Sequence, residues 1–333
     1  KNMLKNNWHI VSGKWRVEES SFTHEVNVDR IFPDSLLINK EKLIDGEIKA
    51  EIIFNSLKKL PPNGPHSAAI VFRYQSPHNY YFAGIGGYGK KFVIGKRLPQ
   101  GSYAINTLGF AEEIKDKVTY NILLRISGRK FSLFLNGENG RIKILDAVDT
   151  IEPFYDNGNI GVMVFDNEDV TLKNFSFDLI PPKCFVVMPF NDSKLQKLKI
   201  YEEIIEKAVS KNKLECIRAD EIFDIKPIIM DIIESIDTSL IIIAEITKDN
   251  ANVFYEVGIA HAKNSNVVLI CDEKRRKKLP FDIAHLRCIF YNSAQVERDN
   301  GDKLKEKLDR TIKSVLERTT RSTQQESPFN FRP

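Results

Sequence analysis

Two hydrophobic patterns divide the chain, and they change near residue 181. From residue 8 to residue 179, short runs of alternating or β-branched residues are separated by turn signals, and no segment has a convincing helical period. This pattern predicts strands throughout the first half. The clearest expected strands are residues 46–54, 67–74, 80–85, 91–96, 118–127, 130–135, 159–165 and 170–179.

The first half also contains short segments in the order typical of one class of sandwich. They are residues 13–18, 72–73 with 79–81, and 131–137 followed by 158–162. These segments resemble concanavalin A-like lectin and glucanase domains, especially the laminin-G-like group, over roughly residues 8 to 180. The resemblance implies an all-β sandwich that acts as a sensor, ligand-binding or assembly module.

Pro181 and Pro182 mark a boundary, because paired prolines lack amide donors and favour extended chain. After it, apolar runs alternate with helical patterns. Residues 240–244 are so apolar that we expect burial on both faces, as in a parallel sheet with helices on each side. The expected strands are residues 184–188, 214–219, 239–246, 266–271 and 288–291, and the expected helices are 195–211, 226–236, 252–263 and 302–318, with a short segment at 280–286.

The sequence therefore predicts a multidomain chain. An all-β concanavalin A-like sandwich occupies residues 1–180, and residues 181–318 form an α/β domain with a flavodoxin-like (Rossmann-like) five-stranded parallel sheet. Residues 319–333 are rich in Ser, Thr and Gln, so we expect a flexible tail there.

An open parallel sheet binds ligands beyond the carboxyl ends of its strands, where the strand order reverses. If the order is 2-1-3-4-5, the crevice lies between the first and third strand ends, and Glu256 falls beside it. With Asn252 as the expected N-cap, Glu256 lies just past the first helical turn, where the positive helix end favours the ionised carboxylate. We expect small residues Gly258, Ala260 and Ala262 to let this helix approach the sheet.

Five segments of the second half, in order, carry another resemblance. They are residues 184–190, 217–220, 244–247, 252–262 and 279–283. They resemble the nucleoside 2-deoxyribosyltransferase-like superfamily, which adjoins the TIR-like domains, over roughly residues 183 to 292. In that family, the glutamate of a Tyr-Glu-x-Gly-x-Ala element attacks or stabilises the anomeric carbon of a nucleoside. Tyr255, Glu256, Gly258 and Ala260 match this element.

The resemblance implies cleavage of an N-glycosidic bond, whose transition state carries positive charge at the sugar carbon. An ionised Glu256 would act there as nucleophile or oxocarbenium stabiliser. NAD is one possible substrate, and neither a cofactor nor a metal is required. The other expected substrate-binding residues are Pro189, Phe190, Asp220, Glu245, Thr247, Asn250, Asn252 and Tyr255.

Two positions depart from the family pattern. Asn250 stands where an aspartate is usual six residues before the glutamate, and Glu245 replaces the aspartate after the third strand. These departures favour one alternative, a non-catalytic nucleotide-binding or TIR-like signalling module. A second alternative is a carbohydrate-binding protein whose α/β domain is auxiliary.

The fusion of these two domains resembles bacterial antiphage defence effectors. That resemblance implies a gated enzyme, either an NAD glycohydrolase or a nucleoside or nucleotide N-glycosidase, that forms a homo-oligomer when active. A glycan, a protein or a signal ligand could bind the sandwich and act as the gate.

Composition narrows these readings only slightly. The content of 42% hydrophobic and 28% charged residues is ordinary for a globular protein, no apolar stretch has the length of a membrane span, and a net charge of +4 is weak support for acidic partners. The chain begins at Lys1 without a methionine, which leaves open a preceding segment. The four cysteines lie in or beside expected strands without metal-ligand spacing, which favours a reducing, cytoplasmic location: Cys184, Cys216, Cys271 and Cys288.

Three further features are expected to have structural roles. Residues 84–89 match G-x-G-x-x-G but lie between two expected strands, with no helix to receive a phosphate. The basic run at residues 274–278 is expected to be a solvated loop. His261 is expected to be a structural histidine.

Overall fold

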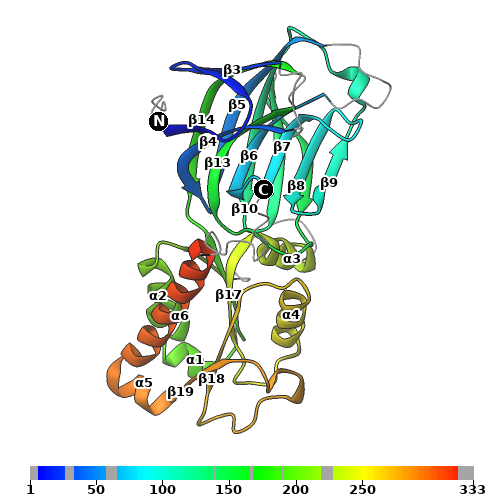
Figure 1. Cartoon of the computed structure of the whole chain (residues 1–333). Coiled ribbons are helices and arrows are strands. Elements are labelled where there is room, and N and C mark those ends of the chain that lie inside the picture. Colours follow the sequence, from blue (N-terminus) through cyan, green and yellow to red (C-terminus); the bar gives the residue numbers. More distant parts are fainter. Residues whose placement is uncertain are drawn as a thin grey trace. The chain divides into compact units, whose positions relative to one another are not determined.

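The structure is a computed structural model that describes residues 7–26, 34–57, 66–137, 140–165, 168–189, 191–218 and 228–321. The chain forms two compact units, one that runs to Ile180 and one over Pro181–Thr319 (Figure 1). Phe190, Asp220 and the expected tail beyond Arg321 lie outside the described residues. The first unit is an all-β sandwich, and the second is an α/β unit.

The sandwich consists of two antiparallel seven-stranded sheets, with the orders β1-β4-β13-β6-β7-β8-β9 and β12-β11-β10-β5-β14-β3-β2. Its strands are β1 (Trp8–Ile10), β2 (Lys14–Val17), β3 (Ser21–Glu25), β4 (Asp34–Leu43), β5 (Asp45–Ser56), β6 (Ser67–Ser76), β7 (Asn79–Gly86), β8 (Phe92–Leu98), β9 (Gly101–Leu108), β10 (Thr119–Ser127), β11 (Lys130–Gly137), β12 (Gly140–Val148), β13 (Gly158–Phe165) and β14 (Asp169–Ile180). A short 3-10 helix, η2 (Ala111–Glu113), precedes β10.

The core of the sandwich follows the two-residue period of its strands. In β5, Ile48, Ala50, Ile52 and Phe54 are buried, whereas the residues that alternate with them are only partly buried. Tyr81 and Phe72 pack in the same core from the facing sheet. The predicted sandwich is confirmed, and the G-x-G-x-x-G segment lies at the end of β7 and in the turn to β8, as expected.

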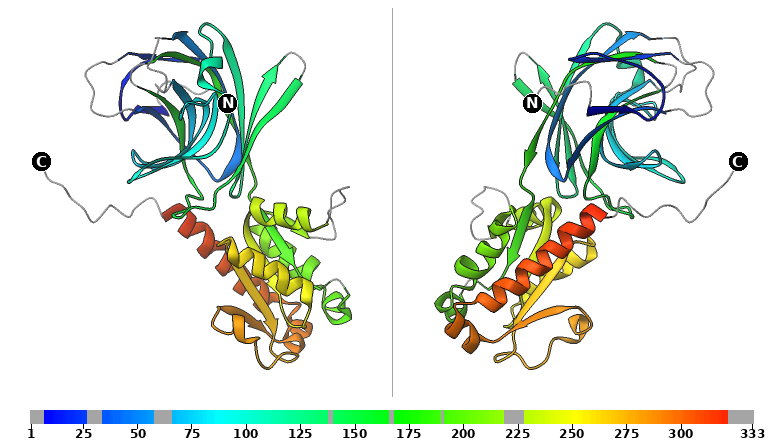
Figure 2. Two further views of the ribbon diagram at one scale, coloured as in Figure 1. Left: turned by 90° about the vertical axis from the view of Figure 1, so that its right-hand side faces the viewer. Right: turned by 60° about the vertical axis from the view of Figure 1, so that its left-hand side comes forward.

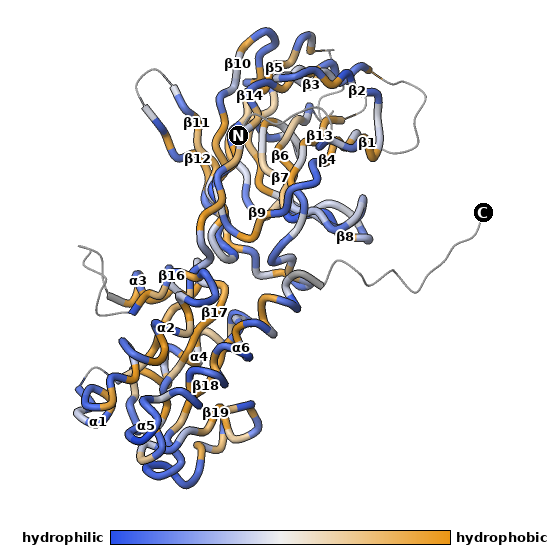
Figure 3. Tube along the Cα trace, turned by 90° about the vertical axis from the view of Figure 1, so that its left-hand side faces the viewer, coloured by the Kyte–Doolittle hydropathy of each residue, from blue (hydrophilic) through white to orange (hydrophobic). Residues whose placement is uncertain are grey.

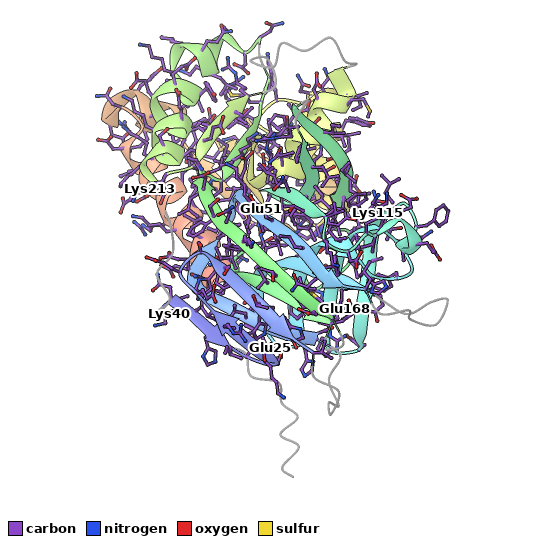
Figure 4. All side chains as sticks on the ribbon, turned by 90° about the horizontal axis from the view of Figure 1, so that it is seen from above. Glu25, Lys40, Glu51, Lys115, Glu168 and Lys213 are labelled. Carbon is purple, nitrogen blue, oxygen red and sulfur yellow. The ribbon has the colours of Figure 1, made fainter. Side chains whose placement is uncertain are left out.

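Several buried polar side chains of the sandwich are paired with one another or with the backbone. Lys96 and Asp149 are both fully buried and form an ion pair of 2.8 Å. The carboxylate of Glu168 contacts His66 Nδ1 at 2.7 Å, and its carbonyl oxygen contacts His24 Nδ1 at 2.7 Å. Figure 4 shows Glu168 and Glu25 at the same end of the sandwich. These contacts join distant strands and give the buried side chains structural roles.

The second unit contains a five-stranded parallel sheet with the order β16-β15-β17-β18-β19, which is the predicted 2-1-3-4-5 order. Its strands are β15 (Lys183–Val187), β16 (Glu215–Arg218), β17 (Ser239–Glu245), β18 (Val267–Asp272) and β19 (Cys288–Tyr291). Its helices are α1 (Ser193–Lys197), η3 (Ile200–Ile205), α2 (Glu206–Lys211), α3 (Ile228–Thr238), α4 (Ala251–Ala262), η5 (Phe281–Ile283), α5 (Ser293–Asp299) and α6 (Asp302–Arg321).

Helices cover both faces of this sheet, with α2 and α6 on one side and α3 and α4 on the other (Figures 1 and 2). Every residue of β17 is buried, and the strand is hydrophobic along most of its length in Figure 3. Helix α6, which buries one face that includes Leu308 and Ile312, instead alternates between hydrophobic and hydrophilic residues. This difference explains why the buried strand could be recognised from its continuous apolar run.

The helices differ from the predicted ones in three places. The helix expected over residues 195–211 is interrupted, because Lys199 has a positive φ of 47° and a π-helical segment, η3, follows it. Helix α5 was not predicted, and α6 continues to Arg321, so the residues that begin the expected tail are helical. Within the described residues, none of the helices combines the length and the apolar character needed to cross a membrane.

Candidate functional site

The loops that follow the parallel strands meet at the carboxyl edge of the sheet. Asp192, after β15, is buried and caps α1 by accepting hydrogen bonds from the backbone amides of Lys194 and Leu195. Its other oxygen accepts a hydrogen bond from Arg275, after β18, at 2.6 Å. Lys248, after β17, lies 3.8 Å from the same oxygen. The first and third strand ends are therefore neighbours, as the strand order requires.

A buried carboxyl lies at the end of β17. Glu245 is fully buried, and it accepts hydrogen bonds from the Thr247 hydroxyl and from the Tyr291 hydroxyl, the latter at 3.1 Å. Burial raises the pKa of Glu245 to about 7, although the hydrogen bonds from Thr247 and Tyr291 oppose this rise. A carboxyl with this pKa can exchange a proton at neutral pH.

Asp272 extends this cluster from the end of β18. Its backbone amide donates to Thr247 Oγ1 at 2.8 Å, and its Oδ1 accepts from the amides of Lys274 and Ser293. Its second oxygen, Oδ2, is buried and has no hydrogen-bond partner among the described residues. Polar groups from three consecutive strand ends thus form one connected network at the edge of the sheet.

Glu256 lies on the buried face of α4. With Val253, Val257 and Ala260, it belongs to the stripe of α4 that is buried, and these three apolar residues pack in one core with residues of β15 and β17. Glu256 is only 8% exposed, and its carboxyl has no ion pair or hydrogen bond within the part of the chain that the structure describes. It is therefore a buried acid separate from the Glu245 network.

The protonation of Glu256 differs from the expectation. The N-cap of α4 is Asn250, whose side chain accepts from the amides of Asn252 and Val253, so the expected N-cap at Asn252 was wrong. Glu256 is consequently deeper in the helix, where the macrodipole has little effect. Burial instead raises the pKa of Glu256 to about 7, opposite to the expected ionised carboxylate.

The small residues of α4 do not all face the sheet. Ala260 is fully buried, but Gly258 and Ala262 are exposed, and a Cβ added at Gly258 would meet no atom within 4 Å. The expectation that all three permit close approach was therefore wrong for two of them. Tyr255 is 59% exposed, so its side chain lies on a different face of α4 from Glu256.

The remaining predicted residues have different positions. Thr247 belongs to the Glu245 network, and Pro189 is buried just after β15. Asn250 uses its side-chain oxygen to cap α4, and Asn252 is exposed in the first turn of that helix. The structure thus joins Glu245 with Thr247 but does not link Tyr255 or Asn252 to them.

Sequence reasoning missed Tyr291 and the two arginines that hold the edge of the sheet. Arg276 donates to the carbonyl oxygen of Thr247 at 2.8 Å and pairs with Asp249, and Arg275 pairs with Asp192. The expected solvated loop was therefore wrong for these two arginines. Tyr291 ends β19, so the rule that selected the other strand ends would also have selected this residue.

No group of three His, Cys, Asp or Glu side chains suited to a metal ion occurs among the described residues. None of the four cysteines forms a disulfide among the described residues, and each lies in a strand of the parallel sheet. Burial lowers the pKa of His261, with a further contribution from nearby His285.

No family model and no curated protein matches this chain. The similar solved structures share low identity with it. They include the carbohydrate binding module CBM66 from Bacillus subtilis, with 18% identity, a TM-score of 0.43, and coverage of 53% of this chain and 97% of that chain. A protein of unknown function with a galectin-like fold from Bacillus subtilis has 14% identity, a TM-score of 0.36, and coverage of 52% and 89%. The lectin UEA-II complexed with galactose has 10% identity, a TM-score of 0.38, and coverage of 52% and 92%.

Proposed function

We propose that the α/β unit cleaves the N-glycosidic bond of a nucleotide or nucleoside, with NAD as one candidate substrate, and that Glu256 is its catalytic residue. The observation that carries the proposal is the buried, unpartnered carboxyl of Glu256, with a pKa of about 7, on the helix that follows β17 at the reversal of strand order. Buried carboxyls with strongly shifted pKa values beside such a crevice are typical of functional sites.

The raised pKa changes the role assigned to Glu256. Near neutral pH, part of this carboxyl is protonated, so with a nucleoside it can donate a proton to the leaving base as the glycosidic bond breaks. Nicotinamide leaves NAD as a neutral base and needs no proton, so with NAD the ionised fraction of Glu256 acts. In both cases the carboxylate lies beside the positive charge that develops on the sugar carbon, and water adds to that carbon and passes a proton to the carboxylate. The same residue would thus assist departure of the base and stabilise the sugar cation.

The Glu245 network supports the reaction from the edge of the sheet. Hydrogen bonds from Thr247 and Tyr291 fix the Glu245 carboxyl, and the unpartnered Oδ2 of Asp272 offers an acceptor for a sugar hydroxyl. We assign these groups to substrate positioning, whereas bond cleavage depends on Glu256.

A base-release assay tests this function. Purified full-length protein is incubated with NAD and a panel of nucleosides and nucleotides, and free base is measured for the wild type, Glu256→Gln and Tyr255→Phe. We expect release by the wild type and by Tyr255→Phe, whose side chain is on the exposed face of α4, and loss of release by Glu256→Gln. Equal release by Glu256→Gln, or no release from any substrate, would contradict the proposal.

A second candidate function is carbohydrate binding by the sandwich. Alternate residues of β7 and β8 form a cluster on the sheet face away from the main core, which includes Tyr80, Phe82 and Val93. At its rim, Asp34 accepts a hydrogen bond from Tyr80 at 3.1 Å, and Arg97 has a buried Nε without a hydrogen-bond partner in the described residues. Tyr80 and Phe82 are themselves buried, so a sugar at this rim would contact the exposed ring of Tyr88, which lies near the same carboxylate and guanidinium.

Glycan binding by the full chain tests this candidate. Tyr88 is 45% exposed in the turn before β8, so Tyr88→Ala should weaken binding of a glycan that occupies this rim. Tyr103 is 41% exposed on β9, and Tyr103→Ala serves as the matched control. Binding that is absent in the wild type, or equally weakened in both variants, argues against this candidate.

A further inference from the structure

A hollow lies in the α/β unit, away from the carboxyl edge of the sheet. Its volume is about 860 Å³, and its lining comes from the starts of β18 and β19, with the residue before each strand, and from residues 310–318 of α6. β18 has six residues, which span about 20 Å, so its two ends are well separated. This hollow therefore does not belong to the site that contains Glu245 or to the position of Asp272.

The hollow has an excess of positive charge. Arg287, Arg310 and Arg318 line it, and no acidic side chain occurs among the described residues of its lining. Arg287 and Arg318 have no ion-pair partner within the described ranges. Arg310 contacts Glu306, but these side chains are 71% and 62% exposed, so an anionic ligand could compete for this guanidinium.

The spacing of the lining residues along α6 places them on one face of the helix. Arg310, Ser314 and Arg318 follow one another at intervals of four residues, so they occupy one face of the helix. Arg287 approaches from the opposite wall, just before β19. Guanidinium groups on both sides of one hollow suit a ligand with several phosphate oxygens, because arginine binds phosphate with two parallel hydrogen bonds.

The volume of the hollow and its apolar lining residues indicate that the ligand is larger than a phosphate ion and has an apolar part. A volume of about 860 Å³ is in the range of small-molecule sites and is larger than a single phosphate needs. Val267, Ile289 and Val315 provide apolar surface beside the arginines. We propose that this hollow, named the arginine pocket, binds a phosphorylated small molecule of nucleoside di- or triphosphate size, with its phosphates on the arginines and its base against the apolar wall.

The proposal is tested with ATP, inorganic tripolyphosphate and adenosine as probes for calorimetric titration of the full chain. The pocket variant is Arg287→Ala with Arg318→Ala. The control is Lys115→Ala with Arg298→Ala, which removes the same charge from exposed side chains outside the pocket. Exposed substitutions of this kind should leave the fold intact, which thermal unfolding checks.

We expect ATP to bind the wild type and the control with similar affinity. The dissociation constant should rise about tenfold for each pocket arginine removed, because a hydrogen bond to a charged group contributes roughly one decade of affinity. Tripolyphosphate should bind more weakly than ATP, and adenosine more weakly still. Tripolyphosphate has no glycosidic bond, so its loss of affinity in the pocket variant separates this site from the proposed catalytic one.

Three results would overturn the proposal. They are no binding of ATP or tripolyphosphate to the folded wild type, equal loss of affinity in the control, and unchanged affinity in the pocket variant. Competition by a 20-nucleotide RNA that binds more tightly than ATP would instead identify the arginines as part of a nucleic-acid surface, and would also exclude the small-molecule assignment.

Discussion

Arg275 donates a hydrogen bond to Asp192 over 2.6 Å, and this ion pair joins the loop after β18 to the start of α1. The carboxylate is almost completely buried. Although burial alone would raise its pKa, the hydrogen bonds from Arg275 and the backbone amide of Leu195 hold the pKa of Asp192 below its usual value. Arg275, from the basic loop after β18, thus holds the loop that follows β15, and the end of β15 borders the crevice.

Arg275→Ala should therefore destabilise the α/β unit. The substitution leaves the buried carboxylate with only the more distant cation of Lys248, at 3.8 Å, and we expect a loss of about 2 kcal/mol in the free energy of unfolding, measured in urea. The loss should become smaller in acid, as Asp192 is protonated. Arg298→Ala removes an exposed arginine from α5 and should have little effect. Equal stability of Arg275→Ala and the wild type would show that the pair does not hold the edge of the sheet.

The N-cap of α4 gives a paired prediction. Asn250→Ala removes the acceptor for the amides of Asn252 and Val253, so we expect a loss of about 1 kcal/mol of stability. Asn252→Ala, in the exposed first turn, should leave stability almost unchanged, because alanine is a good helix former. Thermal unfolding of both variants compares them directly. The reverse order of stability would restore Asn252 as the cap.

Glu256 makes stability depend on pH. Its pKa is about 7 in the folded protein against 4.5 for an ordinary glutamate, so between these values the folded state holds a proton that the unfolded chain releases. The free energy of unfolding should consequently fall as the pH rises through this range, and it should stay lower above it. In urea unfolding, the free energy of unfolding of Glu256→Gln should fall with rising pH by up to about 3 kcal/mol less than that of the wild type.

The pKa of Glu245 is also raised, to about 7. Part of the fall in the free energy of unfolding with rising pH should therefore remain in Glu256→Gln. A decline of equal size in the variant and in the wild type would mean that Glu256 is ionised normally.

The sandwich contains a buried ion pair that can be tested separately. Lys96→Met leaves Asp149 buried without its cation, and we expect a loss of about 3–5 kcal/mol in urea unfolding. Adding Asp149→Asn should recover part of that loss, because the uncompensated charge is removed. Lys49→Met breaks an exposed pair with Asp178 and should cost less than about 1 kcal/mol. Additive losses in the double variant would show that the two charges do not interact.

The pattern of hydrophobic and polar residues predicted the strands in which every residue is buried and those in which buried residues strictly alternate with partly buried ones. The continuous apolar run of β17 required burial on both faces, and the alternation in β5 required one face in the core. By contrast, β9 was missed because none of its residues is buried, so its sequence has no buried face to signal a strand. Its existence depends on hydrogen bonds to β8, which a local pattern does not encode.

The sequence by itself determined the domain boundary at Pro181–Pro182 and the fold classes of the two units. It also identified Glu256 as the candidate catalytic residue. The period of Val253, Val257 and Ala260 could also have indicated which face of α4 is buried. Only the tertiary structure decided the protonation of Glu256, because its pKa depends on the water excluded by segments distant in the chain. It also brought Tyr291 to Glu245 and Arg275 to Asp192, contacts that arise because parallel strands end at one edge.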